Sequence, residues 1–422
     1  MSFSLSLYRR VMGTMHAIAP TLLNRRVQRG KEDPIRFRER LGQTKTPRPE
    51  GKLVWFHGVS VGESLSALPV IERLRAERPD LALLITSATT TSADILAKRL
   101  PDGVIHQFAP IDTPQAVSAF LHHWHPDLAI FIESDIWPVL LQDLSKRKTP
   151  HVLLSARITE KTWRGWQRFK GAMRKLLSGY SVILPQDAAS EDRLRDMGPN
   201  VKLGPRTNLK LLGTPLPVDA AALKSLKKLI GKPFVYLAAS THYGEDTLIA
   251  KALEPALWGG DLLILVPRHP IKAGEIRLDL EAAGYKIAQR SLSEPITDGT
   301  QIYLADTLGE LGLFFSIAHI TIMGGSFLDG IGGHNPLEPA RQGKSVITGP
   351  DIGNWSGIFS NLLAEDAAFR VLGPTELGFL VGQLRKHPEA VKQADQRALA
   401  ISQRGAETLE TVMTALSGLL PL

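Results

Sequence analysis

The chain has 422 residues, of which 43% are hydrophobic and 22% are charged. These proportions are those of ordinary globular proteins, so a collagen, a coiled-coil rod and a wholly disordered chain are excluded. The length exceeds that of one usual domain and indicates at least two. Because the sequence contains no cysteine, it also excludes disulfides, cysteine-ligated zinc, iron–sulfur clusters and thiol catalysis.

Basic residues are concentrated at the N-terminus. Residues 1–48 contain eleven Lys and Arg side chains but only three Asp and Glu side chains, and this difference equals the net charge of +8 of the whole chain. The remainder is therefore neutral overall. Within residues 1–23, helical spacing predicts one apolar stripe. The stripe consists of Tyr8, Val11, Met12, Met15 and Ile18.

The stripe and the arginines that follow it have two interpretations. Together they are typical of a helix that lies on an anionic membrane surface, and we favour this interpretation. The alternative is a helix packed on the body of the protein, with solvated arginines. We expect no membrane span in this segment, because its longest stretch without Lys or Arg, residues 11–24, is shorter than the roughly 20 residues required. No nucleic-acid-binding motif accompanies the charge, so we expect no nucleic-acid partner.

The body of the chain alternates between short apolar runs and amphipathic helices, which is typical of parallel sheets buried on both faces. A first set of strands is predicted at 53–59, 81–88, 128–134, 151–156 and 181–186. A stretch rich in Gly, Pro and Thr, residues 203–218, is the best linker candidate. A second set of strands is predicted at 234–240, 262–268, 285–289, 302–306, 320–326 and 345–349. The pattern predicts two Rossmann-like α/β domains that bind ligands beyond the carboxyl ends of their strands.

A glycine-rich loop at 324–345 follows one of these strands. Its glycines allow backbone N–H groups to approach a phosphate, and a following helix N-terminus favours the anion. Glu338, in the first turn of that helix, is positioned to accept hydrogen bonds from a ribose diol. The loop is not a Walker A motif, which would require glycine at position 338, and it lacks the dinucleotide-binding fingerprint. The alternative is a plain glycine-rich turn.

Arg268 and His269 follow the strand predicted at 262–268, in the same half of the chain as the glycine-rich loop. An arginine beyond a strand end is a natural clamp for phosphate or carboxylate. A lone arginine would more often form a surface ion pair. The nearby loop favours anion binding instead.

Acidic residues follow two strands of the first half. Glu63 lies at a strand-to-helix turn, where a carboxylate acts as a general base or, more commonly, as a partner of the helix dipole. Glu133 and Asp135 follow a neighbouring strand, so we expect Glu63 and Glu133 to face one site. Ser64 lacks the G-x-S-x-G pattern of a nucleophilic serine. Since neither H-E-x-x-H nor D-x-D occurs, we expect no obligatory metal.

Ten segments, in order along the chain, together resemble the transferases of 3-deoxy-D-manno-octulosonic acid (Kdo), which transfer Kdo onto a lipid A precursor. Ten ordered matches over nearly the whole chain are far more specific than any one of them. The segments are LYRR (7–10), RFRERLG (36–42), HGVSVGES (57–64), FIESDIWP (131–138), SARIT (155–159), TNLK (207–210), ASTHYGED (239–246), VPRHP (266–270), DTLGEL (306–311) and GGSFLDGIGGHNPLEP (324–339).

The resemblance implies a GT-B glycosyltransferase, with two Rossmann-like domains facing a central cleft and an N-terminal membrane-associating helix. We place the basic N-terminal segment at 1–48, the acceptor domain at 49–212 and the CMP-Kdo donor domain at 213–400. Residues 401–422 are expected to form a C-terminal helix that packs back on the N-terminal domain. The family uses CMP-Kdo without a metal or other cofactor, inverts the anomeric centre and works at the cytoplasmic face of the bacterial inner membrane.

The resemblance also assigns roles to residues by position. Glu63 matches the general base that deprotonates the acceptor hydroxyl, and Glu133 and Lys210 match residues that stabilise the transition state. The segments that bind CMP match Arg268, His269, Leu308, Gly309, Glu310, Asn335, Pro336, Leu337 and Glu338.

Two departures from the family pattern concern loop geometry. Thr207 stands where the family usually has glycine before Asn-Leu-Lys, and Pro185 stands in place of alanine before Gln186. Two other classes of protein remain as alternatives. A GT-B nucleotide-sugar epimerase acting on a UDP-sugar would need no lipid contact, which the N-terminal segment disfavours. A non-catalytic lipid-binding protein with this fold would not need the catalytic carboxylates, and their presence disfavours it.

Overall fold

The computed structural model describes residues 3–133, 136–213 and 215–422. The chain forms two compact units. The first contains residues 1–213 and 405–422, and the second contains residues 214–404. The expected divisions, at 212/213 and 400/401, thus differ by one and four residues from those found. Asp135, a predicted site residue, lies outside the described residues.

The first unit is built on a six-stranded parallel sheet in the order β3-β2-β1-β4-β5-β6. Its strands are β1 (Leu53–His57), β2 (Ala82–Ser87), β3 (Ile105–Phe108), β4 (Leu128–Ile132), β5 (His151–Ala156) and β6 (Val182–Pro185). The strand order reverses between β1 and β4. In Rossmann-type sheets, the loops that follow such a pair of strands form the ligand-binding edge.

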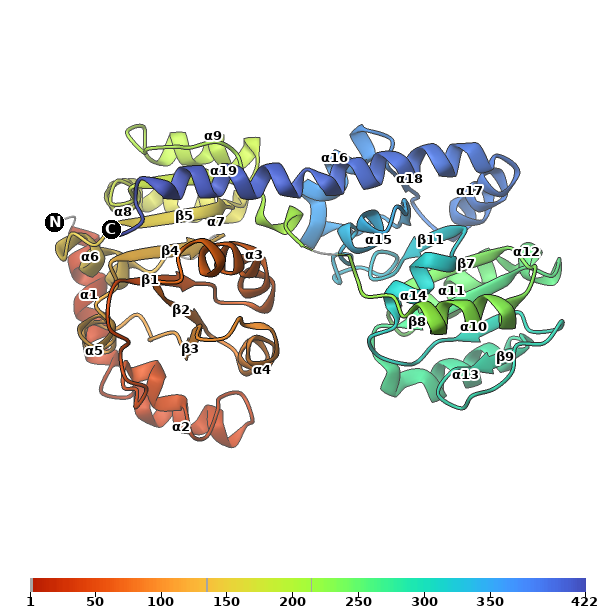
Figure 1. Ribbon diagram of the computed structural model, residues 1–422, viewed down its shortest axis with the longest axis horizontal. Coiled ribbons are helices and arrows are strands. Elements are labelled where there is room, and N and C mark those ends of the chain that lie inside the picture. The colour runs from red at the N-terminus through yellow and green to blue at the C-terminus, as the bar shows by residue number, and fades with distance from the viewer. Residues whose placement is uncertain (1–2, 134–135, 214) are drawn as a thin grey trace. The chain divides into compact units, whose positions relative to one another are not determined.

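Helices cover both faces of this sheet (Figure 1), because its strands alternate apolar side chains to either side. Trp55 packs with α1, α5, α6 and α8, whereas Phe56 packs with α3, α4 and α19. The helices are α1 (Phe3–Met15), α2 (Ala19–Gln28), α3 (Val61–Glu77), α4 (Thr90–Arg99), α5 (Pro114–Trp124), α6 (Pro138–Lys146), α7 (Glu160–Trp166), α8 (Lys170–Leu177), α9 (Ala188–Met197) and α19 (Gly405–Ser417), with 3-10 turns η1 (Phe37–Leu41), η2 (Gln167–Phe169) and η3 (Leu209–Leu211).

The N-terminal helix differs from the predicted single stripe. Tyr8 and Met12 pack against the core of the first unit, whereas Val11, Met15 and Ile18 are exposed. Four of the five predicted residues thus lie in α1 at the predicted spacing, but Ile18 lies beyond its end. Only Tyr8 and Met12 contact the core, so the helix presents apolar side chains to both core and solvent. Among the described residues, no helix combines the length and the apolar character that crossing a membrane requires.

The second unit contains a seven-stranded parallel sheet in the order β13-β12-β11-β7-β8-β10-β9. Its strands are β7 (Val235–Thr241), β8 (Leu262–Pro267), β9 (Ile287–Gln289), β10 (Ile302–Leu304), β11 (Ile320–Met323), β12 (Val346–Thr348) and β13 (Ala368–Arg370). Its helices are α10 (Ala220–Ile230), α11 (Glu245–Ala252), α12 (Glu254–Trp258), α13 (Ala273–Ala282), α14 (Leu311–Ile317), α15 (Leu337–Arg341), α16 (Ser356–Ala364), α17 (Pro374–Lys386) and α18 (Pro388–Gln403), with η4 (Pro270–Lys272) and η5 (Gly353–Trp355).

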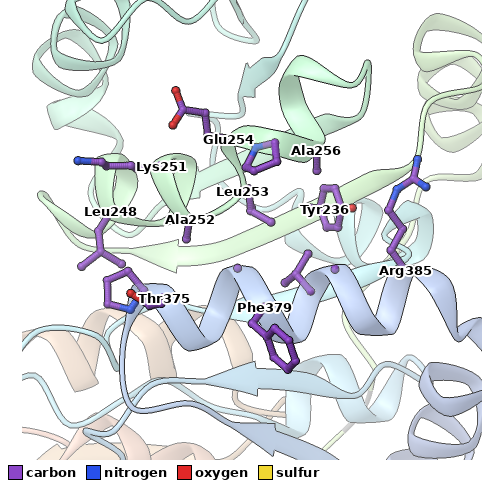
Figure 2. Close-up of a pocket in the computed structure, with 15 residues that line it drawn as sticks. Tyr236, Leu248, Lys251, Ala252, Leu253, Glu254, Ala256, Thr375, Phe379 and Arg385 are labelled. Atoms are coloured by element: carbon purple, nitrogen blue, oxygen red, sulfur yellow. The ribbon is translucent and has the colours of Figure 1, made fainter.

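The loops after β7 and β11 meet at the switch point of this second sheet, since the chain crosses from one side of β7 to the other. A groove in the same unit lies elsewhere, between α11, α12 and α17 (Figure 2). It is lined by Tyr236, near the amino end of β7, and by Leu253 and Phe379. The two parallel sheets with flanking helices confirm the predicted pair of Rossmann-like units. Membrane association of the N-terminal helix stays a prediction.

Candidate active site

Glu63 lies in the first turn of α3, directly beyond β1, and its side chain folds back onto the turn. Its Oε2 atom accepts hydrogen bonds from the backbone N–H groups of Val59 (2.6 Å) and Ser60 (3.3 Å). The Ser60 hydroxyl in turn accepts from the Glu63 N–H, which completes a capping box. Glu63 therefore stabilises the start of the helix, which is the commoner role of a lone glutamate at such a turn. Such donors stabilise the ionised carboxylate.

Glu133 and Lys210 form a partly buried ion pair beyond β4. The Lys210 ammonium lies 3.0 Å from Oε1 of Glu133, and the two side chains are 18% and 10% exposed. Glu133 has a φ of +62°, a conformation that non-glycine residues adopt at a cost and that is common at functional sites. Since β1 and β4 are neighbours in the sheet, the pair and Glu63 follow adjacent strand ends, as the sequence predicted.

Sequence reasoning missed the residues that hold Lys210. Its 3-10 turn begins at Asn208, whose side-chain oxygen accepts from the Lys210 N–H (3.0 Å) and from the Gln186 amide (3.2 Å). The Ser155 hydroxyl accepts from the Leu209 N–H at 3.3 Å. Ser155 occupies an irregularity at the end of β5, with a φ of +55°. The bulge aims its hydroxyl at the turn, and no sequence pattern marks it.

The departure at Thr207 does not disturb this turn. Thr207 is absent from the described non-glycine residues with positive φ, so the position accepts a side chain. Its N–H donates to Pro185 O at 2.8 Å, which joins the turn to the end of β6. Its buried hydroxyl has no hydrogen-bond partner among the described residues. The threonine is therefore compatible with the loop, at the cost of one unsatisfied hydroxyl.

In the second unit, Glu245 ties the loop after β7 to the glycine-rich loop after β11. Its carboxylate is fully buried and accepts from the N–H groups of His242 (2.8 Å), Gly325 (2.6 Å) and Phe327 (2.8 Å). Three charge-assisted bonds of this kind hold both loops in a fixed geometry. No role was assigned to Glu245 from the sequence, although its segment ASTHYGED was singled out.

The glycine-rich loop uses its amides differently from the prediction. The N–H groups of Gly330 and Gly332 donate to Asp351 Oδ2, at 2.8 and 2.9 Å, and those of Gly325 and Phe327 donate to Glu245. Internal carboxylates thus occupy four amides, and the prediction that these groups are available to a phosphate is wrong. The helix that follows, α15, has only five residues.

Polar side chains gather instead beyond β7, β8 and β11. His242 follows β7, Arg268 and His269 follow β8, and His334 lies in the loop after β11. The imidazoles of His242 and His334 are joined at 3.0 Å between their Nε2 atoms, and the His269 ring centroid lies 5.6 Å from that of His242. No described carboxylate forms an ion pair with Arg268. The edge therefore carries an unneutralised cation beside three imidazoles.

The remaining predicted CMP-binding residues follow β10 and β11 on the same edge. Glu310 pairs with Arg290 (2.6 Å), which lowers the pKa of its carboxyl group. Neighbouring Leu308 is 83% exposed, and Gly309 has a φ of +85°. The Asn335 side chain accepts from the N–H of Leu337 and donates to Glu338, and Pro336 precedes α15. All the predicted CMP-binding residues thus follow strands at one edge of one sheet.

Comparison with known proteins identifies relatives over most of the chain. Residues 35–212 match the family model described as 3-deoxy-D-manno-octulosonic-acid transferase (kdotransferase). A probable mitochondrial Kdo transferase of Arabidopsis thaliana is 33% identical over 94% of this chain and 92% of its own length. The Kdo transferase of Haemophilus influenzae is 32% identical over 92% of this chain and 91% of its own.

Solved structures resemble the chain in fold alone. A glycosyltransferase of Rickettsia africae superposes with a TM-score of 0.60 at 13% identity, covering 88% of this chain and 99% of its own. The UDP-GlcNAc 2-epimerase of Neisseria meningitidis superposes with a TM-score of 0.56 at 15% identity, covering 86% of this chain and 100% of its own. At these identities the likeness does not distinguish a transferase from an epimerase.

The two sheets, with their polar carboxyl edges, define a protein of the GT-B class. The relatives at about one-third identity decide its chemistry. The chain belongs to the family of 3-deoxy-D-manno-octulosonic acid transferases. It is thus a glycosyltransferase that transfers Kdo, as the resemblance predicted, and the epimerase and lipid-binding alternatives are set aside.

Proposed function

We propose that the enzyme transfers Kdo from CMP-Kdo to the lipid A precursor lipid IVA, with inversion at the anomeric carbon and without a bound metal. The acceptor hydroxyl oxygen forms the new bond to the anomeric carbon. The bond from that carbon to the phosphate oxygen of CMP breaks, and its electron pair leaves with CMP. Glu63 takes the hydroxyl proton.

The observation that carries this proposal is the ion pair between Lys210 and Glu133, at the ligand edge of the first sheet. Departure of CMP gives an oxocarbenium-like transition state, in which positive charge grows on the sugar ring. Two fixed, oppositely charged groups stabilise such charge separation without rearrangement. Glu63, whose carboxylate accepts hydrogen bonds from two backbone N–H groups, follows the adjacent strand, where we place the acceptor hydroxyl.

The donor belongs at the edge of the second sheet. Negative charge develops on a single phosphate as CMP leaves, and the Arg268 guanidinium offers two parallel N–H donors for it. His269 lies next to it, while the segments at 308–310 and 335–338 follow neighbouring strands. We assign these segments to the cytidine and the ribose. The charge on the phosphate is met by side chains, which fits transfer without a metal.

We further propose that the N-terminal helices lie on the cytoplasmic face of the bacterial inner membrane. An exposed apolar stripe runs along α1 and α2, with side chains between 41% and 84% exposed. It consists of Phe3, Leu7, Val11, Met15, Ile18 and Leu22. Arg10 and Arg25 lie exposed on the same helices, and the exposed Arg29 follows the end of α2. Apolar side chains beside cations suit an anionic leaflet that carries an anionic lipid acceptor.

The direct test is incubation of the enzyme with CMP-Kdo and tetraacylated lipid A precursor, followed by mass spectrometry of the lipid. We expect the lipid mass to increase by one or more Kdo residues and CMP to be released in equal amount. Addition of EDTA should leave the rate unchanged. An unmodified lipid in the presence of anionic vesicles would contradict the proposed acceptor, and inhibition by EDTA would contradict metal-independent transfer.

A further inference from the structure

His242 and His334 form a hydrogen-bonded pair at the switch point of the second sheet. They lie far apart in the chain, in the loops after β7 and β11, yet their Nε2 atoms are 3.0 Å apart. The two ring planes are within 5° of parallel. Because one Nε2 must carry a proton and the other must accept it, at least one of the two rings is neutral, and two neutral rings would have to be opposite tautomers.

The surroundings hold this pair in place. Glu245 fixes the backbone of His242 and, through Gly325, the start of the loop that carries His334. Gly325 has a φ of +71°, and a Cβ atom there would lie 2.7 Å from the His334 ring. Glycine is therefore needed for the loop to lie against the imidazole. Such support is typical of side chains whose geometry matters for function.

Basic side chains and one carboxylate surround the pair. Arg268 and His269 face it from the loop after β8, and Glu245, at the start of α11, is the carboxylate near His242. Burial first, and then His242, Arg268 and His269, lower the pKa of His334 to about 4. Burial also lowers the pKa of His242, with Glu245 opposing the effect. The pair is therefore neutral at pH 7 while no anion is bound.

We propose that the His242–His334 pair, together with Arg268, binds the phosphate of the donor and takes up one proton as the phosphate arrives. This inference rests on the proposed CMP-Kdo donor and adds two residues to its site. A bound anion compensates the repulsion from Arg268 and His269 and turns the neutral pair into an imidazolium bonded to an imidazole. The pair then donates an N–H to the phosphate, and the proton comes from solvent.

This arrangement gives binding a pH dependence of definite sign. Since the bound state carries one proton more than the free state, affinity for a non-titrating anion must rise as the pH falls from 8 to 6. The phosphate gains negative charge as its bond to Kdo breaks, and the positive charge of the protonated pair then stabilises it more strongly. The pair thereby favours the leaving cytidylate over the intact donor.

Isothermal titration calorimetry with the full chain tests the inference. The probes are the methyl ester of CMP and, separately, sulfate, because neither titrates between pH 6 and 8. Titrations in two buffers of different ionisation enthalpy measure the protons taken up. We expect proton uptake with both probes, increasing towards pH 6, and Kd for the ester falling over the same range.

His334→Gln and His242→Gln keep hydrogen-bonding groups but cannot become charged. Each should abolish the proton uptake and weaken ester binding about tenfold. His387→Gln, at an exposed histidine of the same unit, should behave as the wild type. Wild-type uptake in both pair variants, or its loss only in His269→Gln, would overturn the inference. Proton-linked binding of sulfate without binding of the ester would overturn the cytidylate donor instead and leave the anion pair standing; binding of neither would overturn both.

Discussion

The ammonium group of Lys210 lies 3.0 Å from the carboxylate of Glu133. Both side chains are largely buried, so solvent screens the pair only weakly. A charge pair of this kind is costly to break, because removal of one partner leaves the other buried and uncompensated. The protein therefore keeps a preformed dipole at the edge of its first sheet. The functional and structural contributions of this pair are separable by experiment.

Lys210→Met should lower kcat by at least about 100-fold, as expected for loss of a preorganised charged group. It should also lower the free energy of unfolding by about 3 kcal/mol, because Glu133 loses its partner. The double variant Glu133→Gln/Lys210→Met should recover most of the stability but none of the activity. Steady-state kinetics and denaturant unfolding measure the two effects.

A matched control is Lys52→Met, which breaks the pair of Lys52 with Asp127, where the lysine side chain is 53% exposed. We expect a stability change below about 1 kcal/mol and full activity there. If the double variant regained catalysis along with stability, Lys210 would be a structural residue only.

Glu63 has two separable functions, as half of a capping box and as the proposed base. In Glu63→Gln the amide oxygen still accepts from the N–H groups of Val59 and Ser60, so the cap is largely kept. We expect kcat to fall by about 10²–10⁴-fold. Ser60→Ala removes the other half of the box and should cost about 1 kcal/mol of stability with little change in kcat. Comparable loss of activity in both variants would indicate that Glu63 acts through the cap.

Two histidines, His57, which is buried, and His106, which is half-buried, make the first unit sensitive to acid. Burial lowers the pKa of His57 to about 3, with Arg40 adding to the effect, and burial together with Arg36 lowers that of His106 similarly. The unfolded chain binds these protons below about pH 6.5, whereas the folded protein does not. The free energy of unfolding must therefore fall as the pH drops from 6.5 towards 3.

His57→Leu removes one of these protons. Between pH 6 and 4, its stability should fall less steeply than that of the wild type, by about 1.4 kcal/mol per pH unit. Urea unfolding at several pH values measures the slope. His122→Gln, at an exposed histidine, should leave the slope unchanged, and an unchanged slope in His57→Leu would show that His57 is not the group responsible.

The exposed stripe on the N-terminal helices should determine membrane binding. Leu7→Ser with Val11→Ser removes two exposed apolar side chains, and burial of each in lipid is worth about 1.5–3 kcal/mol. Co-sedimentation with vesicles rich in anionic phospholipid should fall at least tenfold. Leu278→Ser changes a leucine of the second unit that is more exposed still and should have no effect. Binding that neither responds to these changes nor weakens with salt would contradict the proposed orientation.

The central strands were predictable because they are continuous apolar runs. The more polar strands at two sheet edges were not predictable. β1, β4 and β8 are fully buried, so their sequences carry no polar interruption. The strands missed, β3 and β13, lie at the edges of their sheets and pair with one neighbour only. His106, Gln107 and Arg370 give them polar character, which hides the strand pattern.

The principal residues of the candidate site were predictable from the sequence. The contacts that hold its loops in place were not. Strand ends followed by Glu63, Glu133 or Arg268 are visible in the sequence, whereas Lys210 was assigned from the family resemblance alone. The occupation of the loop amides by Asp351 and Glu245 depends on contacts between distant segments, which local patterns do not encode. The same holds for the positive φ of Ser155 and Ser240 at bulges ending β5 and β7. Tertiary packing imposes these conformations, against the local preference.

The C-terminal helix packs against the turn that carries Lys210 through one glycine. Gly405, the first residue of α19, is buried, and a Cβ atom there would lie only 2.4 Å from the carbonyl oxygen of Leu211 in η3. Backbone cannot yield as a flexible side chain does, so Gly405→Ala must push α19 and η3 apart. Since Lys210 lies in η3, the displacement should reach the pair with Glu133.

We expect Gly405→Ala to lower the free energy of unfolding by about 1–3 kcal/mol and kcat by roughly tenfold, because misplacement of a catalytic group by a fraction of an ångström is costly. Gly418→Ala, where a Cβ atom would meet nothing within 4 Å, is the matched control and should be neutral. Loss of stability without loss of kcat would mean that η3 keeps Lys210 in place without α19. Loss of both, with KM for the donor unchanged, would establish that the end of the chain positions a residue far before it in sequence.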